Sequence, residues 1–323
     1  MKSWLTGLGY TDYELTPASE DASFRRYFRL RQGGQSWIVM DAPPQKESCE
    51  AFVKVARKLS AARLNAPDIN HENHADGFLL MTDFGDECYL QRLAQDSVDK
   101  LYGDAMAAIL TMQTSIDTAD LPNYDETLLR AEMELFKEWF LENLLQIEMT
   151  PGQLGRWHLT TDTLVQNALE QPQVFVHRDY HSRNLMCLDS DNPGILDFQD
   201  AVNGPVTYDL VSLLRDCYID WPESRVDQWL MDFLELASPG HLRGIDASRF
   251  MRWFNLMGAQ RHLKAIGIFS RLKLRDGKEG FIKDIPRTLN YLKAIATREK
   301  SMVGLYQMIN ELSLGFRIKA LKP

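Results

Sequence analysis

Short apolar runs separated by turn residues dominate the first eighty or so positions of the chain. Residues 23–31 (SFRRYFRLR) and 35–41 (QSWIVMD) flank a pair of glycines, and together they predict a β-hairpin. Residues 77–83 (GFLLMTD) have the composition of a third strand, while the apolar positions within residues 46–64 recur at helical spacing. This part is therefore predicted to be a small antiparallel sheet with one helix.

After residue 86 the apolar positions follow helical stripes instead. Helices are predicted for residues 98–114, 127–145, 162–172, 207–218, 225–237, 248–269 and 298–314. One β-rich block, residues 174–197, interrupts them. The pattern predicts an α+β protein with an N-terminal lobe at residues 1–84 and a larger, mainly helical lobe at residues 85–323. We expect a ligand to bind in a cleft between two such bodies.

The composition of the chain indicates which binding partners and which cellular compartment to expect. The chain has 45 acidic and 36 basic residues and a formal net charge of −9, which disfavours binding to nucleic acid. Its 4 cysteines have neither zinc-type spacing nor the density of a disulfide framework. Neither a signal peptide nor a membrane-spanning segment is indicated. We expect a cytoplasmic protein with no membrane partner, no nucleic-acid partner and no obligate protein partner.

The densest group of reactive side chains lies in residues 174–214. Residues 174–176 are predicted to form a strand that ends before His177, and a hairpin at residues 185–196 is predicted to end at Asp197. Asp179 precedes Asn184 by five positions. Magnesium is commonly held by one or two carboxylates together with substrate phosphates, so this combination suits a site that handles a nucleotide.

Residues 177–184 (HRDYHSRN) resemble the H-G-D-x-H-x-x-N pattern of the aminoglycoside phosphotransferase family, the small-molecule branch of the protein-kinase-like fold. The segments DASFRRYFRL, IVMDAPP and QRHLKAIGIFSRL, the last followed by RDGK, resemble a narrower group within that family. Members of this group are bacterial kinases of cell-wall recycling that phosphorylate N-acetylmuramate and N-acetylglucosamine at the C1 hydroxyl. The resemblance spans nearly the whole chain and is most specific in the catalytic block.

The resemblance implies an enzyme, a sugar kinase that uses ATP and Mg²⁺. Asp179 would orient and deprotonate the acceptor hydroxyl, while Asn184 and Asp197 would hold the metal. His177 would brace the catalytic loop. Asp209, at the start of the following helix, would hold that loop in shape.

A second match to the kinase pattern is interpreted differently. Asp83-Phe84-Gly85 spells the magnesium-binding triplet of protein kinases, but it precedes the catalytic loop, whereas the metal triplet must follow it. Its place is taken by Asp197, followed by Phe-Gln. We therefore predict that Met81, Asp83 and Phe84 belong to the crossing between lobes and lie beside the adenine of ATP.

One position departs from the kinase template, which has a phosphate-binding Lys on its third strand. Met40 stands there in this chain. Ser23, Arg25 and Arg26, in a glycine-free turn, are predicted to contact the nucleotide phosphates. The missing charge would come from Arg25, Arg26 or a Lys of the following helix (Lys46, Lys54 or Lys58). The alternative is a nucleotide-binding pseudokinase that acts as an interaction protein, but an intact set of Asp179, Asn184 and Asp197 favours activity.

The acceptor is predicted to be small, because only residues 200–206 separate the metal triplet from the next helical segment and leave no room for a peptide platform. Substrate contacts are predicted for six polar residues: His181, Arg215, Asp216, Arg261, His262 and Lys264. The basic residues among them favour a neutral or anionic sugar, because Arg binds carboxylates well. Phosphorylation of another alcohol, such as an aminoglycoside, choline or a thioribose, stays open.

Overall fold

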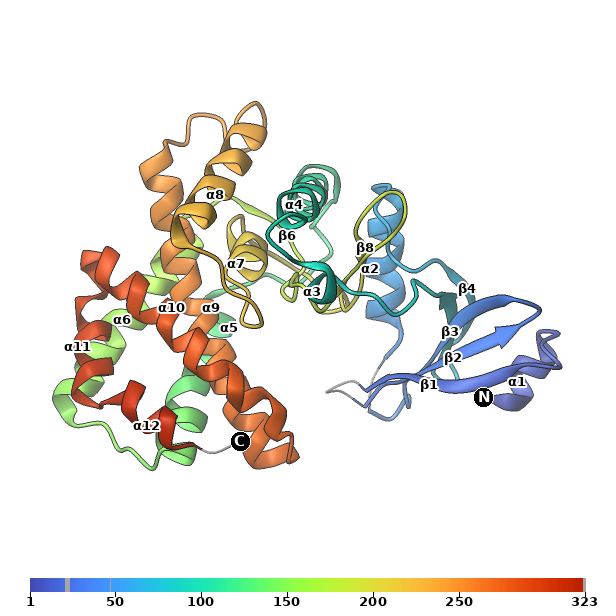
Figure 1. The fold of residues 1–323 in the computed structure, drawn as a ribbon, viewed down its shortest axis with the longest axis horizontal. Helices are drawn as coiled ribbons and strands as arrows, with labels where there is room; N and C mark the ends of the chain where they lie inside the picture. The colour runs from blue at the N-terminus through green and yellow to red at the C-terminus, as the bar shows by residue number, and fades with distance from the viewer. Residues whose placement is uncertain (21–23, 47, 322–323) are drawn as a thin grey trace. The chain divides into compact units, whose positions relative to one another are not determined.

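The computed structural model describes residues 1–20, 24–46 and 48–321. Five strands near the N-terminus form one antiparallel sheet in the order β1-β2-β3-β5-β4 (Figure 1). The strands are β1 (Glu14–Glu20), β2 (Arg26–Gln32), β3 (Gln35–Asp41), β4 (Ile69–Asn73) and β5 (Phe78–Thr82). The predicted hairpin of β2 and β3 is confirmed. Its turn residues Gly33 and Gly34 have φ angles of +60° and +82°, which glycine adopts without steric cost.

The two edge strands, β1 and β4, were not predicted from the sequence. β1 contains Pro17, which cannot donate a hydrogen bond to a sheet and is tolerated at an edge. β4 has the sequence INHEN, in which polar residues outnumber apolar ones. Each of these strands is stabilised by backbone hydrogen bonds to the neighbouring apolar strand. The amino-acid composition of the edge strand itself does not indicate this stabilisation.

Helix α2 (Glu50–Ala61) lies within the predicted helical segment and buries one face through Phe52, Val53, Val55, Ala56 and Leu59. After β5 the chain forms the short helix α3 (Tyr89–Arg92) and the long helix α4 (Val98–Ser115). The predicted hairpin in the catalytic block is also present, as β7 (Leu185–Met186) paired with β8 (Gly194–Ile195). Its second strand is fixed by Ile195, whose backbone N–H donates to the Asn65 carbonyl at 2.7 Å.

The residues group into two compact units that are both discontinuous along the chain. The first unit contains residues 1–116 and 183–201, and the second contains residues 117–182 and 202–323. The β7–β8 hairpin thus belongs with the N-terminal sheet, since its strands pair with segments near Asn65 and Cys88. The predicted lobe division between residues 84 and 85 stays a prediction.

The second unit is mainly helical. Its elements are α5 (Glu126–Leu135), the π-helix η1 (Phe136–Leu144), α6 (Pro151–Leu169), α7 (Tyr208–Leu214), α8 (Glu223–Ala237), α9 (Ala247–Asp276), the 3-10 helix η2 (Glu279–Asp284), α10 (Ile285–Arg298), the 3-10 helix η3 (Lys300–Met302), α11 (Val303–Glu311) and α12 (Leu314–Ala320). Strands β6 (Gln173–Val176) and β9 (Val202–Pro205) pair antiparallel. The strand predicted at residues 174–176 is therefore confirmed, while β9 and α10 were not predicted.

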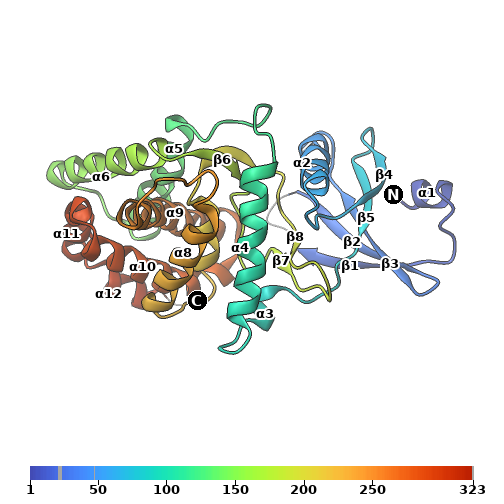
Figure 2. The same ribbon diagram turned by 90° about the horizontal axis from the view of Figure 1, so that it is seen from above.

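Helix α9 is the centre of this unit (Figure 2). It is 30 residues long and contacts α5, α6, α7, α8 and α10. At Gly267 the helix passes so close to α5 that a Cβ atom would lie 2.4 Å from the backbone carbon of Leu135. Because α9 has neighbours on most sides, it buries polar residues as well as apolar ones. None of the described helices combines the length and the apolar composition that a membrane crossing requires.

Candidate active site

The loop that carries Asp179 follows directly on β6 and is held by α7. Asp209, in the first turn of α7, accepts a hydrogen bond from the backbone N–H of His177 at 2.7 Å and another from that of Arg178 at 3.1 Å. Its side chain is buried. Burial raises the pKa of Asp209 to about 7, although both backbone N–H groups oppose that shift. These bonds hold the backbone of the first two residues of the loop. The supporting role of Asp209 in catalysis stays a prediction.

Asp216 holds the same loop at its other end. The carboxylate accepts the backbone N–H of Ser182 at 2.9 Å and also the Ser182 hydroxyl. Its second oxygen accepts the backbone N–H of Tyr218 at 2.9 Å. The sequence predicted a substrate contact for Asp216. In the structure the side chain is 1% exposed and binds protein groups with both oxygens, a geometry that suits loop support.

Asp179 lies between these two anchors, half-buried, with its backbone N–H donating to His177 Nδ1 at 3.2 Å. Desolvation alone would raise the pKa of this carboxyl. The positive charges of Lys264, His181, Arg261 and Arg178 outweigh that effect and lower the pKa of Asp179 to about 2. Asp179 is therefore ionised at neutral pH, as a group that accepts a proton must be.

Arg178 adopts a backbone conformation that is unusual for its residue type. Its φ angle is +77°, in the left-handed region that costs a non-glycine residue about 1–2 kcal/mol. The side chain forms an ion pair with Glu132 of α5, and both side chains are largely buried. The H-G-D pattern has glycine at this position, and glycine adopts a positive φ angle without steric cost. Arg178 has that cost, but its side chain forms an ion pair that glycine could not form.

Glu132 was not predicted as a site residue. Its Oε1 atom also accepts from Lys264 Nζ at 3.0 Å, and its Oε2 atom accepts from the Tyr124 hydroxyl. Burial alone would raise the pKa of Glu132, but the charges of Lys264 and Arg178 lower it below its ordinary value. The sequence held little signal for this role, because a Glu on a predicted helix is most often solvated.

Three further predicted substrate residues lie on or against α9. Arg261 is 6% exposed and stands over the Tyr208 ring, with its guanidinium carbon 5.8 Å from the ring centroid. Arg215 is 1% exposed and donates to Asn255 and Glu223 at 2.9 and 3.1 Å. His262 is fully buried, where burial lowers its pKa to about 3 and its Nε2 atom lies 3.0 Å from the Arg215 carbonyl. Arg215 and His262 have the contacts of core residues.

The two histidines of the catalytic block occupy different environments. His177 is fully buried, and its ring packs edge-on against Tyr180 with the centroids 5.5 Å apart. Its predicted bracing role stays a prediction. His181 is partly exposed and packs edge-on against Tyr218 at 5.2 Å. It is therefore the histidine of this block that a ligand can reach.

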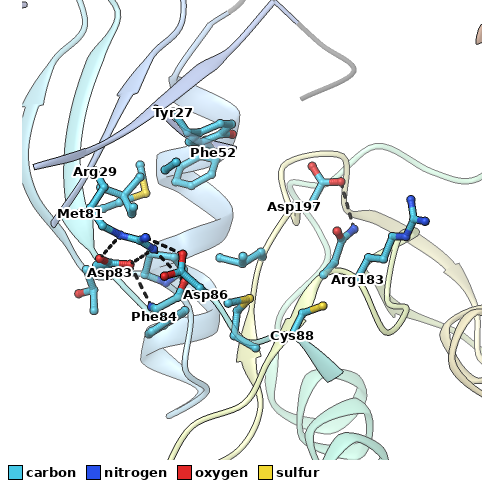
Figure 3. Close-up of a pocket in the computed structure, with 18 of the residues that line it drawn as sticks. Tyr27, Arg29, Phe52, Met81, Asp83, Phe84, Asp86, Cys88, Arg183 and Asp197 are labelled. Carbon is cyan, nitrogen blue, oxygen red and sulfur yellow. Dashed lines mark hydrogen bonds and ion pairs between the residues drawn. The ribbon is translucent and has the colours of Figure 1, made fainter. Parts of the chain in front are cut away.

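A cavity of about 450 Å³ lies within the first unit, between the sheet and the β7–β8 hairpin (Figure 3). Its lining includes the predicted nucleotide residues Met81, Asp83 and Phe84, together with the predicted metal residues Asn184 and Asp197. The structure thus brings two predicted groups to one pocket, although they are a hundred residues apart along the chain. Apolar groups such as Ile38, Phe52 and Leu196 complete walls suited to a flat base.

Arg29 of β2 organises one side of this pocket, as Figure 3 shows. Its guanidinium forms a two-bond contact with Asp83, at 2.6 and 3.0 Å, and donates to Asp86 at 2.5 Å and to the Gly85 carbonyl at 3.0 Å. Burial alone would raise the pKa of Asp83, but the bond from Arg29 lowers it. The Asp83 carboxylate therefore holds the segment in place, and Arg29 is a second residue that the sequence did not indicate.

The predicted metal residues are in direct contact. Asn184 Nδ2 donates to Asp197 Oδ2 at 3.1 Å, and Gln199 Nε2 donates to Asp197 Oδ1 at 2.9 Å. The amide nitrogen of Asn184 thus lies against the carboxylate of Asp197. Within the described ranges no three His, Cys, Asp or Glu side chains gather into a metal site of their own. One carboxylate and one amide oxygen fit Mg²⁺, which is usually completed by phosphates and waters.

The structure also bears on the missing strand Lys. Met40 is fully buried in β3, opposite Tyr27 and Leu79 of the neighbouring strands. Among the described residues that line the cavity, the cationic ones are Arg29 and Arg183. The lining does not include Arg25 or Arg26, and Arg26 forms an ion pair with Asp41. Lys46 stands 4.1 Å above the Phe24 ring. Ser23 lies outside the described residues, so its predicted role stays a prediction.

The first unit has a five-stranded sheet and a nucleotide-sized pocket, and in the sequence an H-R-D loop precedes an Asn–Asp pair. This fold and these residues are typical of a kinase-like phosphotransferase. The model of the phosphotransferase enzyme family (APH) matches residues 14–250, and the chain belongs to this family.

Curated proteins with similar sequences are named as kinases of two amino sugars. An N-acetylmuramate/N-acetylglucosamine kinase of Pseudomonas aeruginosa is 46% identical over 94% of this chain and 89% of that protein. A protein of the same name from Neisseria meningitidis is 42% identical over 97% of this chain and 95% of its own length.

Solved structures agree in fold. An ADP-bound aminoglycoside phosphotransferase has a TM-score of 0.60 at 16% identity, covering 91% of this chain and 97% of its own. A Plasmodium vivax ethanolamine kinase has a TM-score of 0.66 at 10% identity, covering 91% and 88%. The predicted α+β, protein-kinase-like fold is confirmed.

Proposed function

We propose that this protein is an ATP-dependent sugar kinase that transfers the γ-phosphoryl group to the C1 hydroxyl of N-acetylmuramate and N-acetylglucosamine, in the recycling of cell-wall sugars. Membership of the phosphotransferase family supports this proposal, as do relatives at 42–46% identity that are named N-acetylmuramate/N-acetylglucosamine kinases. Adenine would lie in the cavity beside Met81 and Phe84. The acceptor would lie at Asp179.

The proposed step needs one proton acceptor and a positioned phosphate. The carboxylate of Asp179 takes the proton of the C1 hydroxyl as that oxygen attacks the γ-phosphorus. The bond from the γ-phosphorus to the bridging oxygen then breaks, which leaves ADP and the sugar 1-phosphate. An anomeric hydroxyl is more acidic than an ordinary alcohol, so the weakly basic Asp179 suffices mainly by orienting it.

A divalent cation fits the Asn184–Asp197 pair. Asn184 would bind it through the amide oxygen and Asp197 through a carboxylate oxygen. When bound, Mg²⁺ neutralises charge on the nucleotide phosphates. The bond between the two side chains keeps both donors at one place before any ligand arrives.

The environment of Arg261 is the observation that favours N-acetylmuramate as an acceptor. Arg261 is nearly buried, and its Nε atom has no hydrogen-bond partner in the described part of the chain. Its charge nevertheless acts on Asp179. A buried guanidinium with an unsatisfied N–H donor is costly. The carboxylate of a lactyl group on the acceptor would supply that partner, and N-acetylmuramate has one.

Two alternatives make different predictions. A cationic acceptor, such as an aminoglycoside or choline, would meet the positive charges of Lys264, Arg261 and Arg178 and be repelled. A nucleotide-binding pseudokinase is favoured by Met40 at the position of the strand Lys. An ionised Asp179 on a loop with two anchors is, however, what an active enzyme requires.

An ADP-coupled assay with a panel of amino sugars and alcohols separates these functions. We expect turnover of N-acetylmuramate and N-acetylglucosamine that depends on Mg²⁺ and falls at least a hundredfold in Asp179→Asn. Unchanged turnover in Asp179→Asn would contradict the role of Asp179. Nucleotide binding without turnover of any acceptor would favour the pseudokinase.

A further inference from the structure

The cavity in the first unit has to accommodate strong negative charge if a nucleotide polyphosphate binds there. Its described lining has three carboxylates and two guanidinium groups, which belong to Asp83, Asp86, Asp197, Arg29 and Arg183. The kinase template holds the nucleotide phosphates with a Lys of the third strand. In this chain Met40 stands at that position, fully buried in β3, so the strand does not provide the cation.

Arg29 is used at one end of the cavity. Its guanidinium donates twice to Asp83 and once each to Asp86 and the Gly85 carbonyl, over distances of 2.5 to 3.0 Å. These contacts engage four of its five N–H donors. They hold the buried Arg29 at residues 83–86, where the base is proposed to lie. The charge for the phosphates therefore has to come from another residue.

Arg183 belongs to the opposite side of the cavity, on the β7–β8 hairpin. The antiparallel register of this hairpin continues beyond its two strands, since the backbone N–H of Leu196 donates to the Asn184 carbonyl at 2.9 Å. The next pair of positions along this register is Arg183 and Asp197. Figure 3 shows both side chains on the hairpin side of the cavity, across from the sheet.

The side chain of Arg183 is exposed and also forms part of the cavity wall. It thus lies where solvent and a ligand in the cavity both have access. The next residue, Asn184, donates to Asp197 at 3.1 Å, and a Mg²⁺ ion held by this pair would be completed by nucleotide phosphates. A neighbouring guanidinium suits the same phosphates, because its planar fork forms two-bond contacts with their oxygens.

We propose that Arg183 binds the phosphate chain of the nucleotide and supplies the charge that a strand Lys supplies in the kinase template. The phosphate-binding cation thus lies on the hairpin side of the cavity instead of the sheet side. This inference rests on the proposed function for the nature of the ligand, a nucleoside triphosphate. It does not depend on the identity of the acceptor.

The test measures the binding of AMP, ADP and ATP by calorimetry, with Mg²⁺ and without any sugar. In Arg183→Met the Kd for ATP should rise about tenfold to a hundredfold, because a charged hydrogen-bonding partner is lost. The Kd for AMP should change less than threefold, since AMP has the base but neither the β- nor the γ-phosphate. Arg183→Lys keeps a charge without the planar fork, so its Kd for ATP should stay at least threefold below that of Arg183→Met.

Arg57→Met is the matched control. Arg57 is an exposed arginine of α2 in the same unit, where it pairs with Glu72, and it is not among the described residues that line the cavity. Its substitution should leave the Kd for ATP within twofold of the wild-type value. Unchanged ATP binding in Arg183→Met would overturn the proposal. So would equal losses for AMP and ATP, because Arg183 would then act on the whole pocket and not on the added phosphates.

Folding is checked by thermal unfolding. Because the side chain of Arg183 is exposed, the Tm of Arg183→Met should stay within about 2 °C of the wild-type value. If Arg183→Met does not fold, the comparison of ATP with AMP in Arg183→Lys decides alone: a greater loss for ATP supports the proposal, and equal values in variant and wild type overturn it.

These titrations need no acceptor, so they separate this inference from the proposed function. If the protein phosphorylates no sugar, the proposed function fails, while the three Kd values still decide the role of Arg183. If the protein phosphorylates N-acetylglucosamine and Arg183→Met binds ATP as the wild type does, the inference fails alone. A wild-type protein that binds none of the three nucleotides would overturn both.

Discussion

Asp209 accepts the backbone N–H of His177 in a hydrogen bond of 2.7 Å, and the bond links the start of α7 to the start of the catalytic loop. Its other oxygen accepts the N–H of Arg178 at 3.1 Å. Both contacts need an acceptor, and a carboxylate provides two.

Asp209→Asn should therefore weaken the loop. An amide turns one acceptor into a donor that faces a backbone N–H, so one buried N–H loses its partner. We expect the free energy of unfolding to fall by about 1–3 kcal/mol and kcat to fall at least tenfold. Urea unfolding and steady-state kinetics measure the two effects. Asp232→Asn, at the surface of α8, is the control; an equal loss in that variant would show that the effect is not specific to the loop.

The raised pKa of Asp209 also predicts a pH dependence of stability. Its ordinary value is 3.8, and burial raises the pKa in the folded protein to about 7. Between these values the folded state binds a proton that the unfolded state does not. The contribution of this group is complete below about pH 4 and is lost as the pH rises to 7, with a slope of about 1.4 kcal/mol per pH unit.

The difference between the wild type and Asp209→Asn isolates that slope. From pH 5 to pH 7 the wild-type free energy of unfolding should decrease relative to that of the variant, which has no proton to lose at this position. Urea titrations at three pH values provide the measurement. A difference that stays constant over this interval would show that Asp209 titrates at its ordinary pKa.

The contacts of Arg29 predict a separate effect, on nucleotide binding. It holds residues 83–86 through two carboxylates and one carbonyl, so Arg29→Met should leave this segment free to move before it binds a base. We expect KM for ATP to rise about tenfold, since hydrogen bonds to charged groups contribute about 1.5–3 kcal/mol, and kcat to change less than threefold. Arg31→Met is the control, because Arg31 lies two residues further along β2 and is exposed. A tenfold loss confined to kcat would contradict this role.

The sequence predicts a catalytic block because its signals are local. A strand, a loop and a hairpin follow one another within residues 174–197, and each polar residue stands at a strand end, where backbone geometry fixes its place. The order of Asp179, Asn184 and Asp197 then favoured Asp197 over Asp83 as the predicted start of the metal triplet. In the structure Asp197 contacts Asn184, and Asp83 contacts Arg29. The metal role of Asp197 stays a prediction.

Glu132 and Arg29 could not be predicted in this way. Each is a charged residue on a regular element, and its burial results from partners far away in the sequence. Arg29 meets Asp83 across 54 positions, and Glu132 meets Arg178 across 46. Composition and spacing report which face of an element is apolar, but they do not report which charge on that face finds a partner. The burial of Arg215 and His262 could not be predicted for the same reason. It results from the packing around α9, which is enclosed on most sides.

Arg261 gives the most specific prediction about the acceptor. If its guanidinium binds the lactyl carboxylate, Arg261→Met should raise KM for N-acetylmuramate by roughly tenfold to a hundredfold, which is the loss of one charged hydrogen-bonding partner at about 1.4–2.7 kcal/mol. N-acetylglucosamine lacks that carboxylate, so its KM should change less than threefold. The ratio of the two kcat/KM values is therefore the quantity to measure.

Arg275→Met is the matched control for that ratio, because Arg275 lies on the same helix, pairs with Asp276 and is largely exposed. It should leave both acceptors unaffected. Equal losses on both sugars in Arg261→Met would mean that Arg261 acts through the charge it places near Asp179, which both acceptors share. A loss confined to N-acetylmuramate instead identifies Arg261 as the residue that recognises the acid group, since no other difference between the two sugars involves a negative charge.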